Sequence, residues 1–182
     1  MKILITSNTK KYFNTYIDFI DHYWIRYFEK RKIQFTLIPN SKTLLSNYLS
    51  KNVDLILLPG GNDISEKNKS SKNRLIIENK LIKFSIKNKI PLLGICRGMQ
   101  IMAIRCGSEL GQVKGHVKTR HCLSGVFTHT VNSYHNSIIL DTPSGFGTLA
   151  TSEDGSIEAI RHKGLPWEGW MWHPEREDVP SK

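Results

Sequence analysis

Cys96 lies in a Gly-x-Cys-x-Gly turn, where the apolar run Ile90–Ile95 changes into a helical pattern. This is the spacing of a nucleophile elbow, a strained strand-to-helix turn that lifts one side chain above a sheet edge while glycines avoid clashes. A thiol placed there lies at a helix N-terminus, where unpaired backbone N–H groups favour an anion. The pattern predicts a nucleophilic cysteine, with a buried structural cysteine as the alternative.

A His-Pro-Glu sequence at residues 173–175 supplies an imidazole and a carboxylate two residues apart. In an extended segment, residues two apart point to the same side, so Glu175 would lie behind His173 if strand geometry continues through Pro174. The carboxylate would fix the imidazole tautomer and leave the other ring nitrogen for Cys96. We therefore expect Cys96, His173 and Glu175 to act together in that order, with the end of a surface strand as the alternative interpretation of His-Pro-Glu.

Paired glycines follow the apolar run Val53–Leu58. At the carboxyl end of a parallel strand, Gly60 and Gly61 would let backbone N–H groups approach a ligand closely. An ordinary β-turn is the alternative.

The elements that must position these residues alternate between strands and helices up to the cysteine. Residues 64–73 are polar and predict a loop, and the aromatic stripe in the first helix predicts a face packed on the sheet. Right-handed crossovers then give a flavodoxin-like, mostly parallel α/β sheet with helices on both faces. The expected strands are 2–6, 33–38, 53–58 and 90–95, and the expected helices are 12–31, 44–49, 74–88 and the helix after Cys96.

The second half of the chain has shorter apolar segments, which predict short antiparallel strands. A polar loop is expected at 132–136. At 182 residues the chain is long enough for one domain and short for two, so residues 1–182 are expected to form a single domain. The expected strands are 125–131, 147–152, 156–162 and 168–172.

The formal net charge is +10, and the whole excess lies in residues 1–93, which carry 17 Lys and Arg against 7 Asp and Glu. A basic group between the glycine pair and the cysteine could attract an anionic substrate, although a solvated helix face explains it equally simply. No nucleic-acid-binding signature accompanies the charge, so no nucleic-acid partner is expected. The basic group comprises Lys67, Lys69, Lys72, Arg74, Lys80, Lys83, Lys87 and Lys89.

Three cysteines, no secretory pattern and no long apolar run predict a cytoplasmic protein with reduced thiols and no membrane segment. One cluster, His116-x4-His121-Cys122, resembles a set of metal ligands but lacks a second close pair. We therefore expect no metal site and no cofactor.

Four separated segments together resemble the class I glutamine amidotransferase-like family, and most of all its γ-glutamyl hydrolase branch. The resemblance implies that a Cys-His-Glu triad attacks a γ-glutamyl amide, forms a thioester and releases glutamate after attack by water. The segments are Pro59-Gly60-Gly61, Gly94-Ile95-Cys96-Arg97-Gly98-Met99-Gln100, Asn132-Ser133-Tyr134-His135 and Trp172-His173-Pro174-Glu175.

The resemblance also implies roles outside the triad. Backbone N–H groups of Arg97 and of Gly60 or Gly61 would form an oxyanion hole. The partner would be a small γ-glutamyl substrate, with an anionic or nucleotide-linked leaving group as its most specific form. Alternatives are a γ-glutamyl-γ-aminobutyrate-type hydrolase, a glutaminase subunit that passes ammonia to a synthetase, and a non-catalytic binding module. The implied substrate-binding residues are Gln100, Asn132, Ser133, Tyr134 and His135.

Overall fold

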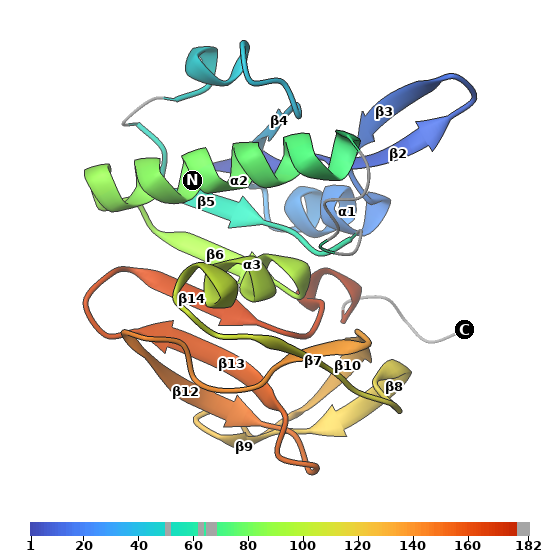
Figure 1. Ribbon diagram of the computed structural model, residues 1–182, viewed down its shortest axis with the longest axis vertical. Coiled ribbons are helices and arrows are strands. Elements are labelled where there is room, and N and C mark those ends of the chain that lie inside the picture. Colours follow the sequence, from blue (N-terminus) through green and yellow to red (C-terminus); the bar gives the residue numbers. More distant parts are fainter. Residues whose placement is uncertain (50–51, 62–63, 65–68, 178–182) are drawn as a thin grey trace.

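The computed structural model describes residues 1–49, 52–61, 64 and 69–177. Eight strands form one sheet in the order β4-β1-β5-β6-β14-β13-β12-β9 (Figure 1). The first five strands in this order are mutually parallel, and the last three are antiparallel to their neighbours. The strands are β4 (Gln34–Ile38), β1 (Lys2–Thr6), β5 (Leu55–Leu58), β6 (Leu92–Ile95), β14 (Trp167–Trp170), β13 (Ile157–His162), β12 (Phe146–Thr151) and β9 (Ser124–Gly125).

Helices cover both faces of the parallel part, which confirms the predicted fold class. Successive strand residues point to opposite faces, so Ile3 and Ile5 pack with Trp24 and Phe28 of α1, whereas Leu4 packs on the side of α2 and α3. Figure 1 shows α2 and α3 in front of the sheet. The helices are α1 (His22–Lys30), α2 (Lys69–Asn88) and α3 (Arg97–Arg105). None of the helices described is long and apolar enough to span a membrane.

The fifth parallel strand comes from the far end of the chain. β14 pairs with β6 so that Trp170 lies opposite Ile95, and the Cys96 N–H donates to the Trp170 carbonyl at 2.7 Å. The residues that follow these two strands therefore leave the same edge of the sheet side by side. This register brings the 96 and 173 regions together across 77 positions of sequence.

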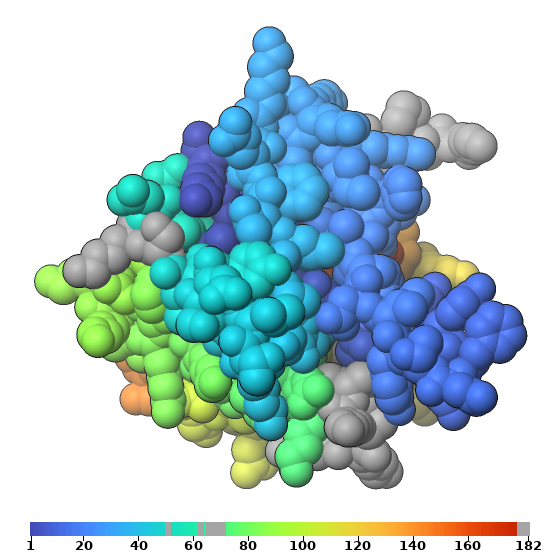
Figure 2. Space-filling model, turned by 90° about the horizontal axis from the view of Figure 1, so that it is seen from above, coloured from blue at the N-terminus to red at the C-terminus, as the bar shows by residue number. Residues whose placement is uncertain are grey.

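The predicted helix at 12–31 is wrong over its first half. Residues 8–19 form a hairpin of β2 (Asn8–Tyr12) and β3 (Thr15–Phe19), which stands out from the body of the molecule (Figures 1 and 2). α1 begins only at His22, because the Asp21 carboxylate accepts the Tyr23 N–H at 3.0 Å and caps the helix. Three of the four aromatic side chains of the hairpin, Tyr12, Phe13 and Tyr16, are exposed and Phe19 is half-buried, so helical spacing there was coincidental.

Four other predicted elements differ in extent. α2 begins at Lys69, so part of the predicted loop at 64–73 is helical; residues 65–68 lie outside the described part of the chain. The predicted helix at 44–49 is a short 3-10 helix, Leu45–Asn47. The predicted strand at 125–131 is divided between β9 and β10 (Thr130–Tyr134), and β10 takes in much of the predicted loop.

Much of β10 was missed because two of its three buried residues, Asn132 and Ser133, are polar and hydrogen-bonded. It pairs with β8 (Val117–Cys122), and the fully buried Ser133 hydroxyl donates to the His116 carbonyl at 2.7 Å. A further small sheet joins β7 (Leu110–Gln112) to β11 (Ser137–Ile139). These short strands cover the region beneath α3 and β14.

Candidate active site

Cys96 occupies the turn between β6 and α3 as the N-cap residue of the helix. Its backbone has φ 49° and ψ −105°, a strained conformation for a non-glycine residue, and its side chain is only 7% exposed. The close packing of α3 on β5 requires Gly98, because a Cβ there would overlap the Leu58 carbonyl oxygen. The elbow geometry is therefore that expected from the Gly-x-Cys-x-Gly spacing.

The His173 imidazole lies between the Cys96 thiol and a buried carboxylate. Its Nδ1 is 2.7 Å from Oε1 of Glu175, and a Cβ built on Gly60 would lie 3.3 Å from its Nε2 and 3.4 Å from Cβ of Cys96, so the other ring nitrogen lies near Cys96. Burial alone would lower the pKa of His173, but the hydrogen bonds to Cys96 and Glu175 and the Glu175 charge outweigh it and raise the pKa to about 9. The imidazolium is therefore the favoured form at neutral pH.

The structure brings these three side chains together by a different route from the predicted one. β14 ends at Trp170, and Pro174–Arg176 forms a 3-10 turn with His173 as its N-cap. The extended geometry expected through Pro174 is wrong, because a tight turn folds the Glu175 carboxylate back onto the ring. Both side chains are almost fully buried, at 4% and 3% exposure for His173 and Glu175.

Asn132 holds the backbone of His173 on both sides. Its Oδ1 accepts the His173 N–H at 3.0 Å, and its Nδ2 donates to the His173 carbonyl at 2.7 Å. Glu177 in turn accepts hydrogen bonds from the Asn132 backbone N–H and side-chain amide at 2.6 and 2.8 Å. The side-chain amide of Asn132 thus hydrogen-bonds both sides of the His173 backbone and positions it.

Gly60 and Gly61 follow β5, and Gly60 packs against both His173 and Cys96. A Cβ built on Gly60 would lie 2.5 Å from Cε1 of His173 and 3.4 Å from Cβ of Cys96. Gly61 has φ +122°, and a Cβ there would overlap the Asn8 side chain. No residue with a side chain fits either position, so the backbone itself forms this wall of the site.

A buried network of Arg74, Glu78 and Arg97 holds the backbone that leads into the glycine pair. Arg74 donates to the Pro59 carbonyl at 2.7 Å, to the Gly60 carbonyl at 3.3 Å and to the Asn8 side chain. Its charge is balanced by Glu78 at 2.8 Å, and Glu78 also pairs with Arg97 at 2.5 Å. Burial lowers the pKa of Arg74 to about 10, although Glu78 opposes this shift.

This network corrects one expectation and reveals residues that sequence reasoning missed. Arg74 is fully buried and cannot contribute to a surface that attracts substrate, whereas Lys72 is exposed. Lys67 lies outside the described residues. The i, i+4 spacing of Arg74 and Glu78 was the available signal for a helical ion pair, but nothing in the sequence indicated its burial.

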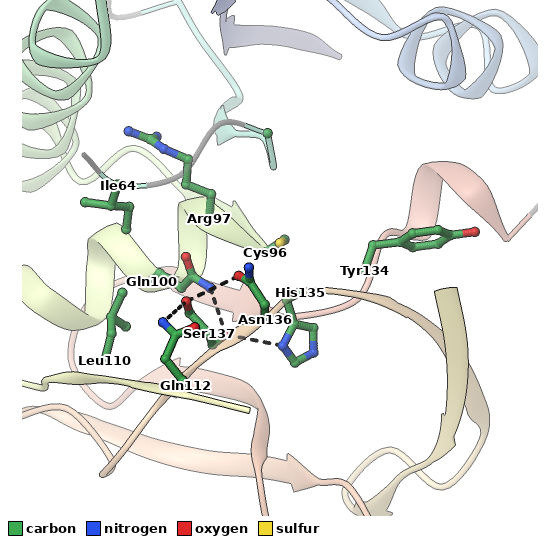
Figure 3. A pocket seen from close by; sticks show the side chains of 11 residues that line it. Ile64, Cys96, Arg97, Gln100, Leu110, Gln112, Tyr134, His135, Asn136 and Ser137 are labelled. Atoms are coloured by element: carbon green, nitrogen blue, oxygen red, sulfur yellow. Dashed lines mark hydrogen bonds between the residues drawn. The ribbon is translucent and has the colours of Figure 1, made fainter. Parts of the chain in front are cut away.

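A cavity of about 330 Å³ opens beside Cys96, and Gln100 and Ser137 are among the residues that line it (Figure 3). The Gln100 amide donates to the Ser137 carbonyl at 3.0 Å, and Gln112 donates to the Ser137 hydroxyl at 3.1 Å. Polar groups thus line the floor of the cavity, and Ile64 and Leu110 complete its sides. A site of this kind can hold a small polar substrate next to the thiol.

Of the remaining predicted substrate residues, Tyr134 and His135 also line this cavity, whereas Asn132 and Ser133 do not. The hydroxyl of Ser133 is used within the protein, as described above. The ring of Tyr134 points away from Gln100 in Figure 3 and packs edge-on against His173, with ring centroids 5.8 Å apart. The ring of His135 turns away from the Cys96 sulfur (Figure 3) and faces His116. Gln100, by contrast, extends its side-chain amide across the cavity floor to the Ser137 carbonyl.

A second cavity, of about 270 Å³, lies on the other side of Gly60 and His173. Asn8, Trp24 and Arg176 line it, together with residues of β3 and the Asp21 cap. The Arg176 guanidinium is 3.2 Å from the Asp21 carboxylate and 4.6 Å from the centre of the Tyr134 ring. The His173 imidazole therefore lines a cavity that also holds a cation, which is paired with the Asp21 carboxylate.

Fold and site together define a class of protein. A mostly parallel α/β sheet carries a cysteine elbow at its carboxyl edge, and the turn after the last strand places a histidine and a carboxylate beside it. Comparison with known proteins identifies the family. Residues 15–182 match the model of the class-I glutamine amidotransferase family, and the chain belongs to that family.

Individual relatives agree with this assignment. The chain is 34% identical over 158 residues to a γ-glutamyl-CDP-amidate hydrolase of Campylobacter jejuni, covering 85% of this chain and 79% of the relative. It is 30% identical to one subunit of the glutamine-hydrolyzing GMP synthase of Methanocaldococcus jannaschii, over 76% of this chain and 73% of that one. A glutamine amidotransferase structure from Thermotoga maritima matches with a TM-score of 0.73 at 19% identity, covering 96% and 76% of the two chains.

Proposed function

We propose that the protein is a cysteine-dependent hydrolase of γ-glutamyl amides, with Cys96, His173 and Glu175 as its triad. The thiolate attacks the γ-carbonyl carbon, and the imidazolium of His173 gives its proton to the leaving nitrogen as the C–N bond breaks. The neutral imidazole then removes a proton from water. That water attacks the thioester, releases glutamate and restores the thiol.

The observation that carries this proposal is the buried contact of His173 with both Cys96 and Glu175 at the elbow. The negative oxygen formed in each step would lie between two backbone donors. One is the Arg97 N–H, which lies in the first turn of α3, and the other belongs to Gly60 or Gly61. Donors of this kind contribute about 3 to 4 kcal/mol each where they have been measured.

We assign the two halves of the proposed substrate to the two cavities. The polar cavity with Gln100 would hold the α-amino and carboxylate groups of the glutamyl half. The leaving group would pass His173 into the cavity with Arg176. A phosphorylated leaving group suits a cation there, so we propose γ-glutamyl-CDP-amidate as the substrate, with cytidine diphosphoramidate and glutamate as products, in keeping with the name of the Campylobacter relative.

Glutamate release from γ-glutamyl-CDP-amidate, glutamine and γ-glutamyl-γ-aminobutyrate tests these assignments. We expect a +129 Da glutamyl adduct on Cys96 in rapidly quenched wild-type protein, and neither adduct nor turnover with Cys96→Ala. Wild-type rates in Cys96→Ala would refute the triad. Equal kcat/KM for all three substrates would leave the triad in place and remove the nucleotide assignment.

The contribution of Arg176 is measured separately. Loss of one charge-assisted hydrogen bond corresponds to about 1.5 to 3 kcal/mol, so Arg176→Ala should lower kcat/KM for the nucleotide substrate by about 10- to 100-fold. It should change kcat/KM for glutamine much less. Arg161→Ala is the matched control, because the exposed Arg161 side chain pairs with Glu168 at 2.8 Å and lines neither of the two cavities. Lys72→Ala tests the exposed charge of α2 in the same assay.

A second candidate function is a glutaminase subunit that delivers ammonia to a synthetase, which the similarity to the GMP synthase relative favours. It predicts slow glutamine hydrolysis by the isolated chain and strong activation by a partner protein. Fast turnover of a γ-glutamyl amide by the isolated chain would argue against it.

A further inference from the structure

Three histidines and a glutamate lie close together between the two-stranded β8–β10 sheet and the eight-stranded sheet. His116 precedes β8, His121 lies within it, His135 follows β10, and Glu158 belongs to β13. One ligand atom from each residue lies within 4.8 Å of all the others. The sequence expectation of no metal rested on the lack of a second close pair of ligands, and the fold supplies that pair as His135 and Glu158.

The distances between these atoms match those around a small tetrahedral ion. Nδ1 of His116 is 3.4 Å from Nε2 of His135, and Oε1 of Glu158 is 3.4 Å from the latter and 3.7 Å from the former. Zinc bonds of 2.0 to 2.1 Å in a tetrahedron place neighbouring ligand atoms about 3.4 Å apart. His121 closes the set, with its ring centre 4.1 Å from that of His116.

Unsatisfied buried atoms point independently to a missing partner. Glu158 is 0% exposed, and neither of its carboxylate oxygens has a hydrogen-bond partner among the described residues. The same holds for Nε2 of His121. A buried carboxylate without hydrogen bonds is costly, and a coordinated cation removes that cost.

The outer partners of two histidines fix the tautomers that coordination needs. Nδ1 of His135 donates to the Ser137 carbonyl at 3.2 Å, which leaves its Nε2 lone pair facing the cluster. Nε2 of His116 donates to Asp154 at 2.9 Å and leaves Nδ1 inward. Asp154 is itself held by the Ser152 hydroxyl at 2.8 Å. A carboxylate or carbonyl behind each histidine is the usual outer arrangement of a metal site.

We propose that His116, His121, His135 and Glu158 bind one divalent transition-metal ion, with zinc as the best match. Four protein ligands leave no open position, so the ion has a structural role. It would join β8 and β10 to β13 and so hold the strand whose Asn132 positions His173. It would also fix Ser137, whose carbonyl holds the Gln100 amide. Cys122 is not a ligand, because its thiol faces the Thr130 hydroxyl at 3.3 Å.

Metal content of the untagged full chain tests the proposal without reference to activity. After growth with zinc and dialysis, we expect about one zinc per chain by mass spectrometry, and visible absorption bands typical of tetrahedral Co²⁺ after exchange with cobalt. His121→Ala and Glu158→Gln should weaken zinc binding by at least about 10-fold, the scale seen even for loss of an outer partner. Two control variants should keep the wild-type metal content: His22→Ala, which removes an exposed histidine, and Cys122→Ser.

A stability measurement covers the case in which a ligand variant fails to fold. Chelation of the wild-type protein should lower its Tm, and added zinc should restore it. A folded wild-type protein with less than about a tenth of an equivalent of zinc, and a Tm indifferent to chelator and zinc, overturns the proposal. Equal zinc binding by wild type and His121→Ala would show an adventitious ion only, which also overturns it.

Discussion

Replacing Gly60 by alanine tests the packing at the centre of the site. The new methyl carbon would lie 2.5 Å from Cε1 of His173, whereas carbon atoms need about 3.5 Å. Because the other side of the new carbon meets Cβ of Cys96 at 3.4 Å, the imidazole must move by about 1 Å. A displacement of that size costs on the order of 100-fold in kcat, and overpacking costs about 1 to 3 kcal/mol of folding free energy.

The assay combines steady-state glutamate release with the rate of Cys96 alkylation by iodoacetamide. Both should fall in Gly60→Ala, because the contact between imidazole and thiol is lost, while circular dichroism shows a folded protein. Gly147→Ala is the matched control, since a Cβ there has only the flexible end of Lys163 nearby, at 3.9 Å. If Gly60→Ala kept kcat within about threefold of wild type, the inferred contact of His173 with Cys96 would be refuted.

Three further outcomes follow from the buried charges. Since the pKa of His173 is raised from 6.5 to about 9, the stabilisation from its charged form is complete below pH 6.5 and is lost as pH rises through 9. Tm and kcat should both decline over that interval, and a Tm that stays constant across it would contradict this. Glu175→Gln should lower kcat by at least about 100-fold and shift that decline to lower pH; an unshifted profile would rule out the proposed carboxylate role. Glu78→Gln leaves Arg74 and Arg97 without their buried counter-charge, so the free energy of unfolding measured with urea should fall by about 3 to 5 kcal/mol. The control Asn79→Ala, whose side chain is only partly buried, should lower it by no more than about 0.5 kcal/mol.

Local signals in the sequence were sufficient for the elbow and the parallel sheet. Strand periodicity, the glycines around Cys96 and the apolar run before them express constraints between near neighbours. The helix predicted at 12–31 failed because the aromatic spacing continued across a hairpin whose outer face is exposed. Periodicity alone does not reveal whether an apolar face finds a partner.

Roles within the segment 132–135 depended on contacts from distant strands. The Asn132 amide hydrogen-bonds the His173 backbone, the Ser133 hydroxyl donates to the His116 carbonyl, and His135 lies in a cluster with Glu158. A polar residue in a short strand looks the same in sequence whether it faces substrate or a buried partner. The direction of each side chain is set by the pairing of β10 with β8.

The sequence by itself determined the chemical groups: a thiol at a strand-to-helix turn, an imidazole with a nearby carboxylate, and glycines where backbone must approach a ligand. Only the tertiary structure decided which groups meet. The pairing of β14 with β6 brings Cys96 to His173, and the packing of β8 and β10 on β13 gathers three histidines around Glu158. These contacts depend on strand register and on packing between segments far apart in the chain. Local sequence propensity does not specify either of them.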